Sequence, residues 1–233
     1  MGKKLGKYLE LTNLKQGTTR DELKNMVATG ILGNVRALVV NYQDLGLLAS
    51  FKAYREASER PLRVVIANFP WMLRSNWFLT LKELKNDWDE VDVLINPAIY
   101  LKKGLARKKA ILKFVHPLVN DLAKGKQVKL IVETVWLRQY CGEDWKSIVK
   151  FIVLVCQKYS IIFKTNSGIY THTFEDLVEE VTLARSYSPL VIIKAAGGIK
   201  TLEQARTIIK AGANMLGSSS GDLAKIGNQV EIN

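Results

Sequence analysis

The sequence has few residues of the kinds that build disulfide frameworks and metal centres. It contains two cysteines, Cys141 and Cys156, and two histidines, His116 and His172. Two cysteines give no disulfide framework, so we expect reduced thiols and a cytoplasmic location. The histidines lack the spacing of metal ligands, and no cluster of cysteine and histidine exists. The sequence therefore predicts no metal site.

Long apolar runs and nucleotide-binding fingerprints are also missing. The longest apolar runs are far shorter than the roughly 18 residues that a membrane-spanning helix needs. The basic N-terminus lacks the apolar segment of a secretory signal. Neither G-x-G-x-x-G nor G-x-x-x-x-G-K-[ST] occurs. Membrane proteins and the common nucleotide-binding sheets are therefore disfavoured.

Acidic residues are few relative to basic ones. The chain has 22 Asp and Glu against 34 Lys and Arg, a formal net charge of +12. The densest basic run, KKGLARKKAILK at residues 102–113, lacks interleaved aromatic residues, and no nucleic-acid-binding motif occurs, so a nucleic-acid partner is disfavoured. We expect a helix with solvated lysines there, and a packed stripe of Leu105, Ile111, Leu112 and Phe114. A positive surface also attracts small phosphorylated substrates.

Short apolar strands alternate with amphipathic segments along the chain. The predicted strands are residues 8–13, 35–41, 62–68, 91–96, 128–133, 161–165, 191–195 and 215–218. The predicted helices include residues 20–28, 46–58, 144–158, 174–186 and 202–211. Eight strands, each followed by a helix-length connection, predict a (β/α)8 TIM barrel, with residues 1–233 as a single domain. An open doubly wound sheet is the alternative.

Two stretches end a buried apolar strand with a lysine. Residues 161–168 read IIFKTNSG and residues 191–198 read VIIKAAGG, so Lys164 and Lys194 each follow three apolar residues. Continuous apolar runs are typical of strands buried on both faces of a parallel sheet. Lysine is rarely buried unless it is paired or has a chemical role. The carboxyl ends of barrel strands form the active-site face, so both lysines are candidate catalytic residues.

Asp92 is a carboxylate within an apolar strand. In the segment EVDVLIN it stands between Val91 and Val93. By period-2 alternation it points into the barrel if the valines pack against helices. An unpaired carboxylate there would be costly, which implies a cationic partner. A purely structural ion pair with lysine is the alternative to a catalytic role.

Two glycine-rich stretches follow the last two predicted strands. Gly197 and Gly198 follow the seventh strand, and GSSSG at residues 217–221 follows the eighth. Glycine lets backbone N–H groups approach an anion closely, and these two loops of a TIM barrel often bind phosphate. Each stretch alone is a common turn, whereas together they indicate a phosphate site.

Five segments, taken in order, resemble the deoxyribose-phosphate aldolase family: EVDVLIN, KLIVETVWL, FKTNSG, IIKAAGGIKTLEQA and AGANMLGSSSG. The resemblance is strongest over residues 90–221 and most specific in KTNSG and KAAGGIKT. It implies a class I aldolase that reversibly cleaves 2-deoxy-D-ribose 5-phosphate to D-glyceraldehyde 3-phosphate and acetaldehyde, without a metal or another cofactor. The expected partners are small phosphorylated sugars and aldehydes, and a second copy of the chain in a homodimer.

The resemblance also implies roles for individual residues. Lys164 would form the Schiff base, Lys194 would be its cationic neighbour, and Asp92 would transfer protons. The implied substrate-binding residues are Thr12, Thr165, Gly168, Gly197, Gly198, Gly217, Ser219 and Ser220. A lysine attacks a carbonyl as the free amine, which a second ammonium and a desolvated interior both favour. The iminium then withdraws electrons, so that the neighbouring C–C bond breaks.

The chain departs from the family pattern at several places. Glu10-Leu11 stands where Asp-His is usual, and Val39-Val40 stands where a cysteine is usual. Trp71 occupies a position where a small residue is common, which we expect to narrow the pocket mouth. These differences bear on substrate range and rate. An aldolase for another phosphorylated sugar therefore stays an alternative, and a non-catalytic, basic nucleic-acid-binding barrel is the alternative from another class.

Overall fold

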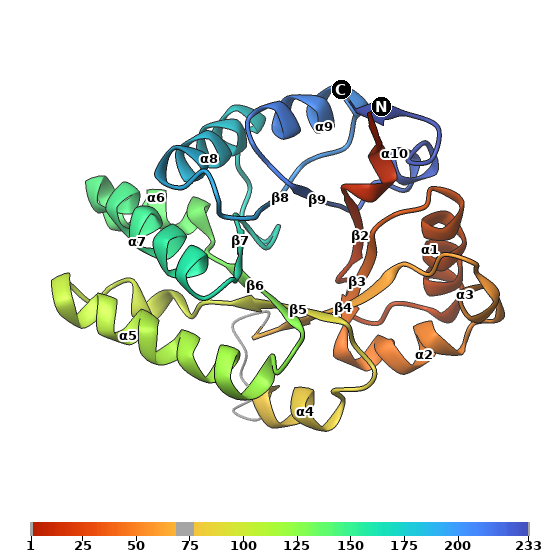
Figure 1. The fold of residues 1–233 in the computed structure, drawn as a ribbon, viewed down its shortest axis with the longest axis horizontal. Coiled ribbons are helices and arrows are strands. Elements are labelled where there is room, and N and C mark those ends of the chain that lie inside the picture. The colour runs from red at the N-terminus through yellow and green to blue at the C-terminus, as the bar shows by residue number, and fades with distance from the viewer. Residues whose placement is uncertain (1, 69–76, 233) are drawn as a thin grey trace.

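Eight parallel strands form the wall of a closed barrel. The computed structural model describes residues 2–68 and 77–232, so that Trp71 lies outside the described residues. Strands β2 to β9 follow one another around the barrel in chain order, and β2 pairs with β9 to close it (Figure 1). The strands are β2 (Leu9–Asn13), β3 (Ala37–Asn41), β4 (Leu62–Ala67), β5 (Glu90–Leu94), β6 (Gln127–Ile131), β7 (Ile162–Lys164), β8 (Ile193–Ala196) and β9 (Met215–Ser218). The predicted TIM barrel is confirmed.

Helices surround the barrel and cover the outward faces of its strands (Figure 1). They are α1 (Arg20–Leu32), α2 (Leu45–Ser50), α3 (Lys52–Glu56), α4 (Trp77–Glu83), α5 (Gly104–Pro117), α6 (Thr134–Cys141), α7 (Trp145–Lys158), α8 (Phe174–Tyr187), α9 (Leu202–Lys210) and α10 (Gly221–Lys225). Valine and leucine side chains from the strands pack against them in one continuous core. Within the described residues, no helix is long and apolar enough to cross a membrane.

Threonine caps define where three of these helices begin. Thr19, Thr173 and Thr201 precede α1, α8 and α9, and each side chain accepts a hydrogen bond from a backbone N–H three residues later. The residue at that position binds back to the backbone N–H of the threonine, which completes a capping box. Such a cap stabilises a helix by about 1 kcal/mol. The starts of these helices are therefore set by local sequence.

The structure corrects two details of the predicted helices. The segment 46–58 forms two short helices, because Phe51 between them has extended backbone (φ −67°, ψ 132°) and a buried side chain. Leu105, expected in the packed stripe of α5, is 66% exposed. The other three residues of that stripe are buried or pack against the core.

The inside of the barrel is apolar on one side and charged on the other. Two small apolar clusters fill the apolar part: Ala37, Val39 and Val64, and Ile66, Leu94 and Ile131. Val39 therefore packs in the interior. The charged part contains Glu10, Asp92, Lys129, Lys164 and Lys194, each at most 2% exposed. At the amino end, the chain termini pair through β1 (Lys3–Lys4) and β10 (Glu231–Ile232).

Candidate active site

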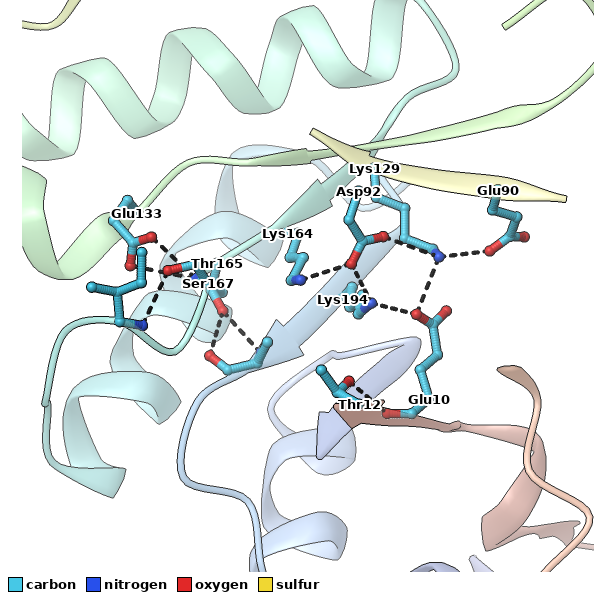
Figure 2. A network of polar contacts seen from close by, with 12 residues as sticks. Glu10, Thr12, Glu90, Asp92, Lys129, Glu133, Lys164, Thr165, Ser167 and Lys194 are labelled. Carbon is cyan, nitrogen blue, oxygen red and sulfur yellow. Dashed lines mark hydrogen bonds and ion pairs between the residues drawn. The ribbon is translucent and has the colours of Figure 1, made fainter. Parts of the chain in front are cut away.

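Asp92 lies at the centre of the charged side chains inside the barrel (Figure 2). Its Oδ2 atom lies 2.7 Å from Nζ of Lys164 and 2.7 Å from Nζ of Lys194. Its Oδ1 atom lies 3.2 Å from Nζ of Lys129. Asp92 therefore points into the barrel, as its alternation with the valines predicted. Three lysines serve as its cationic partners.

The register of the strands brings these residues together. Lys164 on β7 and Lys194 on β8 are direct partners across neighbouring strands. Asp92 on β5 and Lys129 on β6 are likewise direct partners. Side chains at paired positions of neighbouring parallel strands leave the same face of the sheet, and in a closed barrel that face is the interior.

A second group of charges continues the network toward the amino end of the barrel. Nζ of Lys129 lies 3.1 Å from Glu10 Oε2 and 2.6 Å from Glu90 Oε2. Arg36, directly before β3, pairs with both Glu10 and Glu90, and Lys194 also pairs with Glu10. We call these seven side chains the interior charge cluster: Glu10, Arg36, Glu90, Asp92, Lys129, Lys164 and Lys194.

Several members of the interior charge cluster were not predicted from the sequence. Lys129 stands between Val128 and Leu130 in a predicted strand, the same anomaly that singled out Asp92. Applied to every strand, that signal would have identified Lys129. Arg36 and Glu90 stand at the starts of strands, where charged residues are ordinary, so no comparable signal marks them.

The charges of the cluster shift one another's protonation. Burial would raise the pKa of Glu10, but Lys129 and Lys194 lower it to about 2. Burial also opposes ionisation of Asp92, yet the three lysines hold its pKa well below the usual value. Burial lowers the pKa of Lys194 from 10.5 to about 8 against the attraction of Asp92 and Glu10, and Lys164 and Lys129 add to the decrease.

A cavity of about 390 Å³ opens at the carboxyl ends of the strands. Lys164 is the member of the interior charge cluster that lines it. Asp92 contacts the amine of Lys164, and neither Asp92 nor Lys194 is among the residues that line the cavity. Of the residues with a predicted substrate contact, six line the cavity: Thr12, Gly168, Gly197, Gly198, Gly217 and Ser219.

Two glycine-rich loops form one wall of this cavity. Gly197 and Gly198 have positive φ angles (119° and 69°), which L residues rarely adopt. Oγ of Ser218 donates to the backbone oxygen of Ile199 at 2.6 Å, which joins the end of β9 to the loop after β8. Lys15 and Lys200 line the same cavity and add positive charge. The arrangement can receive an anionic group.

Thr165 and Ser220 lie beside the cavity rather than among its lining residues. Oγ1 of Thr165 donates to the backbone oxygen of Ala196 at 3.3 Å and accepts from its N–H at 3.1 Å. Oγ of Ser220 accepts from Leu223 N–H at the start of α10. Both hydroxyls therefore have structural partners, and their contact with substrate stays a prediction.

The loop after Lys164 is held from behind by buried polar side chains. Glu133 has left-handed backbone (φ 58°), and its carboxylate accepts from the backbone N–H of Ser167 at 3.2 and 3.4 Å. Burial raises the pKa of Glu133, although Ser167 and Lys164 oppose this change. Asn166 donates to Glu180 at 2.8 Å. These contacts fix the path of the chain from β7 into the cavity wall.

No cluster of three or more His, Cys, Asp or Glu suited to a metal ion occurs among residues 2–68 and 77–232. His172 lies near the glycine loop instead, where its ring occupies the space that a side chain at Gly197 would need. Burial lowers the pKa of His172, which keeps the ring neutral near pH 7.

Known proteins match this chain along nearly its whole length. No family model matches the chain. The deoxyribose-phosphate aldolase of Thermococcus gammatolerans is 29% identical over 232 residues, 95% of each chain, and that of Thermococcus kodakarensis is 29% identical over 223 residues, 94% of each. The solved structure of deoxyribose phosphate aldolase from Aeropyrum pernix superposes with a TM-score of 0.71 at 20% identity, covering 97% of this chain and 92% of that one, which supports the fold. On these full-length relatives, the chain belongs to the deoxyribose-phosphate aldolase family.

Proposed function

We propose that the protein reversibly cleaves 2-deoxy-D-ribose 5-phosphate to D-glyceraldehyde 3-phosphate and acetaldehyde, with Lys164 as the Schiff-base residue. The observation that carries this proposal is the position of Lys164. Its side chain is 2% exposed, it lines the cavity, and its Nζ lies 2.7 Å from Asp92 Oδ2. A buried amine that borders a cavity and contacts an acid-base group is suited to attack a carbonyl.

Asp92 can transfer protons between the two lysines. One oxygen of Asp92 contacts both amines, so a proton can pass from Lys164 through this oxygen to Lys194 and leave a free amine at the cavity. Lys194, with a pKa lowered by burial to about 8, can hold or release that proton near neutral pH. The same pair can return a proton when the adduct forms and breaks.

The bond changes follow from iminium chemistry. The Lys164 amine adds to C1 of the open-chain sugar, and loss of water gives the iminium. A base removes the proton of the C3 hydroxyl, the C2–C3 bond breaks, and its electron pair forms the enamine as the C3 aldehyde leaves. Protonation of C2 and addition of water then release acetaldehyde and the amine. Asp92 and Lys194 supply and accept these protons, directly or through a water.

The glycine-rich loops supply the site for the phosphate. Ser218 joins the end of β9 to the loop after β8, and Lys200 and Ser219 line the cavity beside this contact. Backbone N–H groups in such loops bind phosphate oxygens. A phosphate bound there sets the distance between the phosphate end of the sugar and the amine of Lys164.

An aldolase for another phosphorylated sugar is the second candidate function. Glu10 best accounts for such a difference in substrate between this protein and its relatives. Its carboxylate reaches from β2 to Lys194, next to the reacting amine. Glu10 carries the same charge as the Asp that is usual in the family, so its longer side chain changes where that charge lies rather than its sign. Rates with a series of phosphorylated aldoses, with acetaldehyde as the common product, distinguish the two candidates.

Borohydride trapping tests the Schiff base directly. The protein is incubated with 2-deoxy-D-ribose 5-phosphate or with acetaldehyde, reduced with borohydride and digested for peptide mass mapping. We expect the added mass on the peptide that contains Lys164, and no adduct in Lys164→Met. An adduct on Lys194 alone would reverse the assigned roles, and no adduct with any phosphorylated aldose would exclude a class I aldolase.

A further inference from the structure

The interior charge cluster holds more positive than negative side chains. Arg36, Lys129, Lys164 and Lys194 are four cations, whereas Glu10, Glu90 and Asp92 are three carboxylates. The lysines and Asp92 and Glu10 are at most 2% exposed, so water screens the excess charge poorly. A buried excess charge is costly, and the cluster can remove it by releasing one proton from a lysine.

Arg36 enters this cluster from the amino end of the barrel, opposite the cavity. Its side chain is 19% exposed. One guanidinium nitrogen pairs with Glu10 and lies 2.9 Å from Glu90 Oε2, and the other pairs with Glu90 Oε1. Arginine keeps its charge at any pH that the folded protein meets, whereas each lysine can lose its charge. Arg36 is therefore the fixed cation of the cluster.

The two carboxylates that Arg36 binds are shared with lysines. Glu10 accepts from Arg36 through Oε1 and contacts Lys129 and Lys194 through Oε2. Glu90 divides its oxygens between Arg36 and Lys129. Without the guanidinium, three carboxylates would face three lysines, and each ammonium would have a full negative charge to balance it.

The groups that face Lys194 come from several strands. Asp92 on β5 and Glu10 on β2 pair with its amine, and Lys164 on β7 is its partner across the strands. Lys129 on β6 reaches the same two carboxylates. On β9 the neighbour of the Lys194 side chain is Gly217, which carries no charge. Arg36 and Glu90 act on Lys194 through Glu10 and Lys129. Glu133, directly before α6, also attracts Lys164, and this carboxylate is common to the wild type and to every variant of Arg36.

We propose, given the Schiff-base reaction proposed above, that Arg36 is a positioning residue that lowers the pH at which one lysine amine of the cluster loses its proton. It does so by holding Glu10 and Glu90 and by supplying the cation in excess. Arg36 lies at the end of the barrel opposite the cavity and acts on the reaction through the carboxylates and lysines between them.

Neutral variants of Arg36 test this assignment through the pH dependence of kcat/KM. Arg36→Gln keeps N–H donors for the two glutamates, and Arg36→Met removes them. In both we expect the acid limb of the profile to move to higher pH by about one unit, which lowers kcat/KM at pH 7 about tenfold, with recovery as the pH rises. Arg36→Lys keeps a charge, and its acid limb should stay near that of the wild type.

A balanced double variant separates charge from packing. Arg36→Gln/Glu90→Gln removes one cation and one carboxylate, so the excess of one positive charge returns. We expect its acid limb to move back toward the wild-type position. Arg63→Met is the matched control, because Arg63 has the same 19% side-chain exposure but pairs with Asp89, which is not part of the cluster. Its profile should not move.

The pH dependence of unfolding gives a readout that needs no activity. Because the pKa of Lys194 is lowered from 10.5 to about 8, the unfolded chain binds a proton that the folded chain has released between these values. The free energy of unfolding of the wild type therefore gains a rising contribution between about pH 8 and 10.5. We expect Arg36→Gln to lose part of this rise, and Arg63→Met to keep it.

Two outcomes would overturn the role of Arg36. Equal loss of activity at every pH in Arg36→Gln, with an unmoved acid limb and an unchanged rise in stability, would show that Arg36 only holds the strands together. A double variant that stays shifted would show that the excess charge is not the cause. If the wild type forms no trappable adduct, the proposed function fails, while the unfolding measurements still decide the role of Arg36.

Discussion

Lys164 and Lys194 are direct partners across neighbouring strands, and one oxygen of Asp92 lies 2.7 Å from the amines of both. An oxygen within hydrogen-bond reach of two amines can take a proton from one and give it to the other. The two lysines and Asp92 therefore form one acid-base unit. Of the two lysines, Lys164 lines the cavity. The amine that reacts with substrate and the amine that holds the proton therefore belong to different residues, Lys164 and Lys194.

The variant Asp92→Asn tests this unit. It keeps the shape of the side chain and removes the charge that the three lysines share. We expect kcat/KM to fall by about 10²- to 10⁴-fold, because the proton path is lost. The free energy of unfolding should fall by about 3–5 kcal/mol, because buried cations lose their partner. Cleavage rates and urea unfolding measure the two effects.

Asp222→Asn is the control for Asp92→Asn. The side chain of Asp222 is 94% exposed and pairs with Lys225 on the surface. We expect both measured quantities to stay at wild-type values. Normal cleavage by Asp92→Asn would remove Asp92 from the reaction.

Glu133 positions the loop that follows Lys164, and its removal should act mainly on substrate affinity. Glu133→Ala deletes both contacts with the N–H of Ser167, next to Gly168 in the cavity wall. We expect KM for a sugar phosphate to rise severalfold, with a smaller change in kcat because Lys164 is held by its own strand. Glu133→Gln keeps an acceptor oxygen and should show a smaller effect. Equal effects of the two variants would contradict a role through the Ser167 contact.

Gly197 and Gly198 differ in what surrounds them, which gives a paired test of the proposed phosphate site. A Cβ at Gly197 would lie 2.3 Å from Cε1 of His172, and the new residue would also have to adopt a φ angle of 119°. A Cβ at Gly198 would meet nothing within 4 Å, and only φ 69° opposes it. We expect Gly197→Ala to raise KM for the sugar phosphate far more than Gly198→Ala. Inhibition by inorganic phosphate, which should weaken in parallel, checks that the change lies in the anion site.

The double variant Gly197→Ala/His172→Ala extends this test. It removes the ring that the new methyl group meets and leaves the unfavourable φ in place. We expect partial recovery of KM, because the clash is relieved and the backbone strain is not. No recovery would show that the backbone conformation alone excludes a side chain at this position.

The sequence predicted the parts of the fold and site that depend on local pattern. The eight strands follow from apolar runs, and the predicted helices 20–28, 174–186 and 202–211 begin at the same residues as α1, α8 and α9. The alternation of β5 placed Asp92 inside the barrel. The lysine that ends an apolar run and meets a glycine-bearing loop identified Lys164, which lines the cavity.

The parts that were not predicted depend on register and on contacts across the barrel. Which carboxylate meets which lysine is set by how far each strand is shifted along its neighbour. Glu10 and Lys129 are 119 residues apart in the chain, and their contact follows from closure of the barrel rather than from either segment. The sequence likewise did not indicate that the hydroxyl of Thr165 pairs with the backbone of β8, while its contact with substrate stays a prediction. Local sequence does not indicate whether a side chain at the end of a short strand contacts the neighbouring strand.

Metal removal should leave activity intact. Iminium formation provides the electron sink that a metal ion supplies in other aldol reactions. Dialysis against EDTA should therefore leave the cleavage rate of the wild type within error of the untreated protein. Loss of activity that returns with zinc would place the protein in another mechanistic class.

The last prediction concerns Lys194 and separates activity from stability. Burial lowers the pKa of Lys194 from 10.5 to about 8, a shift that destabilises the folded state by about 3 kcal/mol at lower pH. Lys194→Met fills a similar volume and leaves three cations, Arg36, Lys129 and Lys164, facing three carboxylates. At pH 7 we expect a free energy of unfolding equal to or above that of the wild type.

The sign of this effect depends on pH. The cost of protonated Lys194 is fully present below about pH 8 and is lost as the pH rises toward 10.5, because the folded and unfolded chains then carry the same neutral amine. The stability advantage of Lys194→Met should fade over the same interval, which urea unfolding at pH 7 and pH 10 measures. The cleavage rate should nevertheless fall by about 10²- to 10⁴-fold, since the amine that accepts the proton of Lys164 is missing. Near-normal cleavage would make Lys194 a structural partner of Asp92, whereas recovery at high pH would mean that Lys194 favours the free amine of Lys164 rather than carrying its proton.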